Sequence, residues 1–224
     1  MTQAEGHDPA PAFLSRNEIE TLCLKAARGA GMSWGLAEEA GFAAAWLAAR
    51  GVDGAGALLA HLQNFAPCFI GVHDRQWRAT NATALCPIML GATLGDHCVL
   101  DAGPWSAPIT IDAVSQPILL VPFLARGAQT CAKPLALTWP GGSIVILANG
   151  DVATTALTAL SRVDVTTLTL SPASDVAPGT APGCPMASLS AATLEKLNTL
   201  ALRTTVPASD TSRRGAGAAT SDND

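Results

Sequence analysis

The sequence contains no tyrosine, and aromatic side chains make up only 4% of its 224 residues. Charged residues are also scarce, at 14%, whereas 49% of the residues are hydrophobic, with alanine, leucine and valine dominating. Because protein cores are densely packed, small aliphatic side chains fill a core only if the backbones approach one another closely. We therefore expect a substantial core built around slim, closely packed helices.

Long apolar runs are also missing. The two longest, Ile118–Ala125 and Ile144–Ala148, are far shorter than the ~20 residues of a membrane-spanning helix, and we interpret both as core strands. The first twelve residues are polar and do not show the basic and then apolar pattern of an export signal. These features predict a cytoplasmic protein with no membrane partner.

Several functional signatures are absent as well. The formal net charge of −5 provides no positive field for a phosphate backbone, so we expect no nucleic-acid partner. The chain has no G-x-S-x-G elbow, no phosphate-binding G-x-x-x-x-G-K-[ST] loop and no H-E-x-x-H motif. Its six cysteines form no C-x-x-C pair, so we interpret them as free thiols. No cofactor is predicted.

The N-terminal third has the pattern of three helices. Ser15 and Glu18 form a capping box that predicts a helix over 16–28. Ser33 precedes a second apolar segment that runs to about Arg50, and Asp53 precedes a third that runs to about Phe65. We expect three helices here.

Short β-prone runs separated by proline and glycine follow. The Pro-Gly-Gly at 140–142 predicts a hairpin between two of them, and a short helix is expected at 157–161. Ser188 or Ser190 is expected to cap a final helix that ends near Arg203. The expected strands are Phe69–His73, Val99–Ala102, Ile109–Val114, Ile118–Ala125, Leu135–Trp139, Ser143–Ala148 and Val163–Leu170.

Together these segments predict an α+β fold with an N-terminal three-helix segment, a central and mainly antiparallel sheet, a C-terminal helix and a polar tail. We expect a flexible N-terminus over 1–12, a single α+β domain over 13–203, and a Gly/Ala/Ser/Arg tail over 204–224 that either stays disordered or folds back on the domain.

Two carboxylates stand out in the second helix. Glu38 and Glu39 are surrounded by alanine, leucine, phenylalanine and tryptophan, with no lysine or arginine three or four residues away. A carboxyl group in apolar surroundings has a raised pKa and suits general acid/base chemistry. Because adjacent helical residues diverge by about 100°, one of the two can equally be an ordinary surface charge. We take Glu38 and Glu39 as the candidate catalytic residues.

The polar tail holds a second candidate constellation. Glycine and alanine allow backbone amides to approach a ligand, and an arginine can hold a carboxylate with two hydrogen bonds. A solvated tail without a function is the alternative interpretation. The candidate substrate-binding residues of the tail are Ser212, Arg213, Gly215 and Gly217.

Metal and thiol sites have weaker support. His73-Asp74 and Asp96-His97-Cys98 contain metal-ligating residue types, but their spacing matches no metal motif, so we predict no metal site. Cys86-Pro87 and Cys184-Pro185 each place a thiol in a turn. A nucleophilic cysteine also requires a base beside it, which the sequence does not identify.

Several blocks of residues, taken together, match the pattern of a known family. They are Leu14–Glu20, Ala26–Gly31, Trp34–Gly41, Ser212-Arg213, Gly215–Ala218 and Asp222–Asp224, and less specifically Cys86–Ile88, Gly91-Ala92 and Pro117–Trp139. Through these blocks the chain resembles the bacterial domain-of-unknown-function family 3726, for which no activity is established. The resemblance implies that the Trp34–Gly41 block and the tail are family features, which adds Trp34 to the candidate substrate-binding residues. The tail departs from the family pattern at Arg214 and at Ala218-Ala219.

The leading prediction is a small-molecule catabolic enzyme of the hydrolase or lyase class, acting on an amino-acid-like or other carboxylate compound. Glu38 and Glu39 would supply acid/base chemistry, and Ser212 with Arg213 would hold the substrate. The first alternative is a non-catalytic subunit that docks on a partner enzyme or on a second copy of itself. The second alternative is a thiol or metal protein that uses His73, His97 and the cysteines.

Overall fold

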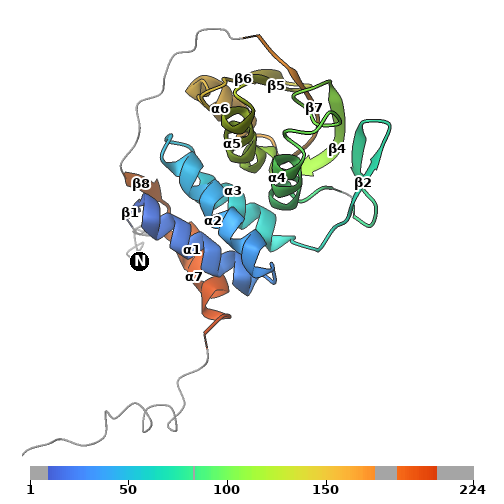
Figure 1. The fold of residues 1–224 in the computed structure, drawn as a ribbon. Coiled ribbons are helices and arrows are strands. Elements are labelled where there is room, and N and C mark those ends of the chain that lie inside the picture. The colour runs from blue at the N-terminus through green and yellow to red at the C-terminus, as the bar shows by residue number, and fades with distance from the viewer. Residues whose placement is uncertain (1–9, 83, 175–185, 206–224) are drawn as a thin grey trace, which may run out of the picture.

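The computed structural model describes residues 10–82, 84–174 and 186–205, and it confirms the α+β class. The helices are α1 (Arg16–Gly29), α2 (Trp34–Ala48), α3 (Gly54–Gln63), α4 (Pro87–Asp96), the 3-10 helix η1 (Pro117–Leu120), α5 (Val121–Cys131), α6 (Thr154–Leu160) and α7 (Ala191–Leu202). Helices α1–α3 come before the strands of the large sheet along the chain, and the later helices lie between those strands or after them, without a regular strand–helix alternation (Figure 1).

The strands form two sheets. One sheet has six strands in the order β2-β3-β4-β7-β5-β6, in which every neighbouring pair except β3–β4 is antiparallel. The other is the antiparallel pair β1–β8. The strands are β1 (Ala12–Ser15), β2 (Ile70–His73), β3 (Gln76–Ala79), β4 (Ile109–Ser115), β5 (Leu135–Trp139), β6 (Gly142–Ile146), β7 (Val165–Pro172) and β8 (Met186–Leu189).

The helices pack in successive layers. Helix α1 lies between α7 and α2, and α2 in turn contacts α3, α4 and α5. Figure 1 shows α4, α5 and α6 on the side of the large sheet that faces α2 and α3. Helix α2 is therefore enclosed on most sides, as its nearly continuous apolar sequence predicts, and it contacts α5 through Glu39 and Phe42.

One face of the large sheet forms part of the core. Along β7, buried Leu168 and Leu170 alternate with exposed Thr167 and Thr169, as expected for a sheet that is covered on one side. The buried row continues across neighbouring strands through pairs such as Leu170 with Leu137. These residues join the buried side chains of the helices in one hydrophobic cluster.

The helix termini follow the local sequence closely. Helix α1 begins at Arg16, and the Ser15 amide donates a hydrogen bond of 2.7 Å to Glu18 Oε2, while the Glu18 amide donates to Ser15 Oγ. These contacts also lower the pKa of the Glu18 carboxyl group, mainly through the amide of Ser15. Gly31 and Gly51, which follow α1 and α2, have positive φ angles of 102° and 73°. The predicted capping box is confirmed.

Close helix packing is also confirmed. A Cβ atom added to Gly41 of α2 would lie 2.6 Å from the carbonyl oxygen of Glu20 on α1. A Cβ added to Gly29 of α1 would collide with the carbonyl group of Leu200 on α7. Since no real Cβ tolerates such contacts, α1 approaches both of its neighbours as closely as backbone permits.

Two predicted strands are wrong. Ile118–Ala125 forms η1 and the start of α5, and residues 99–102 lie in turns. Periodicity cannot distinguish a fully buried strand from a buried helix. Pro122 argued against a strand, because proline cannot donate to a strand ladder, and it lies in the first turn of α5. The sequence analysis also missed α4, whose first residue is Pro87.

The first and the last strands of the described chain pair with each other. Strand β1 begins at Ala12, within the segment expected to be flexible, and its partner β8 begins at the end of the long Pro/Gly/Ser stretch over 171–186. This pairing joins residues that are far apart in sequence, and no local pattern specifies it. The hairpin of β5 and β6 at Pro140–Gly142 is confirmed.

Candidate functional site

The two candidate carboxylates of α2 lie in different environments. Glu38 is exposed, whereas the Glu39 side chain is 30% exposed and contacts α5. Arg126 Nη2 donates a hydrogen bond of 2.6 Å to Glu39 Oε2. The charge partner that the sequence could not supply within α2 therefore comes from a helix 87 residues further along the chain.

Aromatic rings hold the guanidinium of Arg126 in place. Its central carbon lies 4.6 Å from the ring centre of Phe42 on α2 and 5.4 Å from that of Phe123 on α5. The two rings pack edge to face, with their centres 5.9 Å apart. The ring faces attract the cation while the Glu39 carboxylate fixes one of its nitrogens. Nearly half of the Arg126 side chain, 48%, stays exposed.

A surface pocket of about 280 Å³ opens beside this ion pair, between α2, α4 and α5. Its polar side chains are Glu39, Asp96, Arg126 and Thr130, and three glycines are also among its lining residues. The full lining consists of Glu39, Gly91, Ala92, Gly95, Asp96, Cys98, Phe123, Arg126, Gly127 and Thr130. One guanidinium and two carboxylates therefore surround a space large enough for a small metabolite, and they complement a ligand that carries both charges.

The remaining predicted site residues do not join this pocket. Glu38 and Trp34 are not among its lining residues. Trp34 is 63% exposed at the start of α2, and the guanidinium of Arg28 lies 4.7 Å from its ring centre. Ser212, Arg213, Gly215 and Gly217 lie outside the described residues, as does Cys184.

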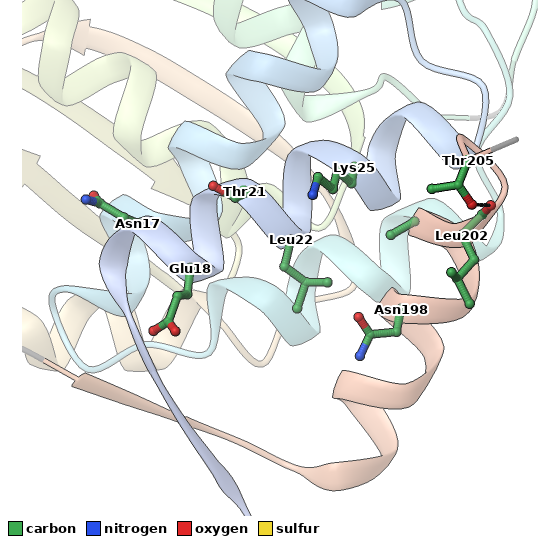
Figure 2. Close-up of a pocket in the computed structure, with 9 residues that line it drawn as sticks. Asn17, Glu18, Thr21, Leu22, Lys25, Asn198, Leu202 and Thr205 are labelled. Atoms are coloured by element: carbon green, nitrogen blue, oxygen red, sulfur yellow. Dashed lines mark hydrogen bonds between the residues drawn. The ribbon is translucent and has the colours of Figure 1, made fainter. Parts of the chain in front are cut away.

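A larger hollow lies between α1 and α7, with a volume of about 490 Å³ (Figure 2). Figure 2 shows Leu22 of α1 near Asn198 and Leu202 of α7, with Glu18 and Lys25 along α1. Glu18 is already engaged in the capping box. None of the predicted site residues lines this groove, and we do not assign chemistry to it.

A second polar cluster is buried where α3, α4 and β4 meet. His61 Nε2 lies 3.2 Å from Cys86 Sγ, and His61 Nδ1 lies 3.2 Å from Ser115 Oγ. Only 6% of His61 and 3% of Cys86 is exposed. Cys86 is the residue that precedes α4, with Pro87 at the first helical position. The structure thus supplies the base that the sequence analysis could not identify beside Cys86.

Burial controls the charge state of this cluster. It lowers the pKa of His61 to about 4. It raises the pKa of the Cys86 thiol to about 11, although the amides of Met89 and Ile88 at the start of α4 act in the opposite direction. Both side chains are therefore neutral at pH 7, which permits a hydrogen bond from the thiol to Nε2 and one from Nδ1–H to Ser115. Sequence analysis missed His61 because one histidine in an apolar helix has no recognisable motif.

The residues considered for a metal site are dispersed. His73 pairs with Asp74 at 3.0 Å on the surface, and the His97 ring packs edge-on against Trp77, with their ring centres 5.3 Å apart. Among the residues that the structure describes, no group of three or more His, Cys, Asp or Glu side chains is arranged to hold a metal ion. Within the same residues, no helix has the length and apolar character needed to cross a membrane.

Comparison with known families confirms the resemblance inferred from the sequence. Residues 14–93 match the model of a protein family of unknown function, DUF3726. The match includes Glu39, His61 and Cys86, whereas Arg126 and Ser115 lie beyond it. It also stops well before the C-terminal tail. Neither the curated proteins nor the solved structures contain a match to this chain.

Proposed function

We propose that this protein is a small-molecule enzyme that takes an amino-acid-like carboxylate compound into the pocket between α2, α4 and α5. The observation that carries this proposal is the Arg126 guanidinium, held against Glu39 and two phenylalanine rings at the mouth of a pocket of about 280 Å³. Arg126 takes the substrate-holding role that the sequence analysis gave to Arg213.

The charges of the pocket support an amino-acid-like ligand over a simple anion. Glu39 occupies one guanidinium nitrogen, which leaves further N–H donors of Arg126 available to a substrate carboxylate. Asp96 lines the same pocket and is exposed, so a negative oxygen is available for a substrate ammonium group. A dicarboxylate or a phosphate would meet repulsion from both acidic side chains.

Glu39 is the acid/base residue of this proposal. A substrate carboxylate that pairs with Arg126 competes with Glu39 for the guanidinium. The released Glu39 oxygen then accepts a proton from the substrate, and Arg126 stabilises the negative charge that develops. Glu38 faces solvent and takes no part.

The free thiols of the described cysteines suit a reducing compartment, so a cytoplasmic location belongs to the same proposal.

Calorimetry with L-alanine, propionate and ethylamine tests the binding step. L-alanine carries both charges, and each of the other two compounds lacks one of them. We expect L-alanine to bind most tightly, and the Arg126→Ala variant to lose at least about tenfold in affinity, since a charge-assisted contact contributes over 1 kcal/mol. Arg78→Ala, an exposed arginine on β3, is the matched control.

Proton NMR of an amino-acid panel in deuterated buffer tests the chemical step. Exchange of a substrate proton or appearance of a product should be lost in Glu39→Gln and retained in Glu38→Gln, its exposed neighbour. Equal affinity of all three calorimetric probes, or identical behaviour of the two glutamate variants, would contradict the proposal. Complexes with a partner whose formation does not depend on Glu39 or Arg126 would favour the non-catalytic subunit.

A further inference from the structure

A fourth polar group completes the buried cluster around Cys86. The Cys86 amide nitrogen lies 3.4 Å from Cys68 Sγ, so the two thiols belong to neighbouring positions in the core. Cys68 also acts on the Cys86 thiol electrostatically, in the direction that favours the protonated form. The cluster thus combines a thiol, a base beside it, a hydroxyl group that orients the base, and a second thiol.

Backbone hydrogen bonds fix this arrangement. The Leu85 amide donates to the Ala113 carbonyl at 2.7 Å, and the Ser115 amide donates to the Leu85 carbonyl at 3.1 Å. The residue before Cys86 is therefore bound to the end of β4, which carries Ser115. His61 comes from α3, and its ring also packs edge-on against Phe65. Three separate elements hold the imidazole between its two partners.

The burial of the two thiols limits which reagents can reach them. Only 3% of Cys86 and 1% of Cys68 is exposed, and neither thiol lines any of the described surface pockets. A bulky acyl or peptide substrate has no route to Sγ, whereas hydrogen peroxide is little larger than water. We propose that Cys86 is a peroxide-reactive thiol, with His61 as its base and Cys68 as the thiol that resolves the oxidised product.

The reaction balances in two steps. Cys86 Sγ attacks one oxygen of hydrogen peroxide while its proton passes to His61 Nε2 in the same step. The O–O bond breaks, and the leaving hydroxide takes the proton back from the imidazolium, which gives a Cys86 sulfenic acid and one water. The Cys68 thiol then attacks the sulfenic sulfur, which forms a Cys68–Cys86 disulfide and releases a second water. Peroxide is the oxidant, and both sulfurs are oxidised.

The chain contains an internal control for this proposal. Cys23 of α1 is fully buried, and burial together with the negative charge of Asp53 raises the pKa of its thiol to about 12. Cys23 is thus as inaccessible as Cys86 but is not held against a histidine. If burial alone governed oxidation, the two thiols would react at similar rates.

Timed exposure of the purified protein to hydrogen peroxide, followed by alkylation and peptide mass spectrometry, provides the test. We expect Cys86 to be oxidised at least about tenfold faster than Cys23, and His61→Gln to remove most of this difference, because a positioned base accelerates such steps by 10² or more. Cys68→Ser should replace the disulfide with a sulfenic acid, which dimedone traps once the protein is unfolded in its presence. His73→Gln, an exposed histidine, serves as the control.

Three results would overturn the proposal. The first is an oxidation rate of Cys86 equal to that of Cys23 in the unmodified protein. The second is an unchanged rate in a folded His61→Gln variant. The third is oxidation that links Cys131 to Cys98, whose carbonyl accepts a hydrogen bond from Cys131 Sγ at 3.1 Å, before it reaches Cys86. The first and third use the native protein, so they remain decisive if His61→Gln does not fold.

Discussion

The two polar clusters lie at opposite ends of α4 and differ in almost every physical respect. The ion pair of Glu39 and Arg126 is partly exposed and borders a pocket, whereas His61, Cys86 and Ser115 meet in the core. The first cluster keeps its charges in contact with water. The second is neutral because burial disfavours the charged forms of His61 and Cys86.

This difference predicts different contributions to stability and function. A partly exposed ion pair contributes little to folding, so loss of either partner should change stability only slightly. A buried hydrogen-bonded cluster affects folding strongly, since loss of one partner leaves the others unsatisfied. Variants of the pocket should therefore change binding, and variants of the core cluster should change stability as well as reactivity.

The largest expected effect is the loss of stability in acid caused by His61. Its pKa is about 4 in the folded protein and about 6.5 when unfolded, so the unfolded state binds the proton first as the pH falls. Stability is fully retained above about pH 6.5 and decreases towards pH 4, by about 3 kcal/mol in total. Urea unfolding at pH 7 and pH 4.5 should show this loss in the native protein.

His61→Gln should be less stable than the native protein at pH 7 but should show a smaller loss between these two pH values. His73→Gln is the control, because the His73 side chain is 81% exposed and should leave the acid loss unchanged. An acid loss of equal size in His61→Gln and in the native protein would assign it to other groups.

A second prediction concerns the packing of α4 against α5, which forms one wall of the pocket. A Cβ added to Gly91 would collide with the ring of Phe123, whereas one added to Gly95, one helical turn later, meets nothing within 4 Å. Gly91→Ala should destabilise the protein by about 1–3 kcal/mol through overpacking. Gly95→Ala should be neutral or stabilising, by up to about 1 kcal/mol. Denaturant unfolding compares the two variants. Equal free energies of unfolding would show that Phe123 and α5 make room for the added methyl group at no cost in stability.

The smallest expected effect is that of Glu39→Gln on folding. Because Arg126 is nearly half exposed, loss of the ion pair should change the free energy of unfolding by less than about 1 kcal/mol. The same variant should abolish proton exchange with a bound amino acid. If Glu39→Gln instead lowered the free energy of unfolding by several kcal/mol, the main role of the ion pair would be to hold α2 against α5.

Helix termini and the family resemblance were predictable because they depend on residues close in sequence. The Ser15–Glu18 capping box involves side chains three positions apart, and the resemblance is confirmed over residues 14–93. The buried apolar run 118–125 was misinterpreted, since its hydrophobicity specified burial but not the type of element. Pro122, the one proline within it, carried the missing information.

The candidate sites were only half predictable, for the same reason. The sequence identified Glu39 as a carboxylate that requires a partner and Cys86 as a thiol that requires a base. It identified neither Arg126 nor His61, because both partners come from other elements and no local spacing relates them. The predicted tail residues lie outside the described part of the chain, so their role stays a prediction.

The sequence by itself determined the α+β class, the ends of α1 and the close approach of its small-residue helices, because local hydrogen bonding, periodicity and side-chain size govern these features. Only the tertiary structure decided that α5 places Arg126 against Glu39, that α3 places His61 against Cys86, and that β8 pairs with β1. These contacts depend on how distant elements bury their apolar faces together, and that free energy is not encoded in any short segment.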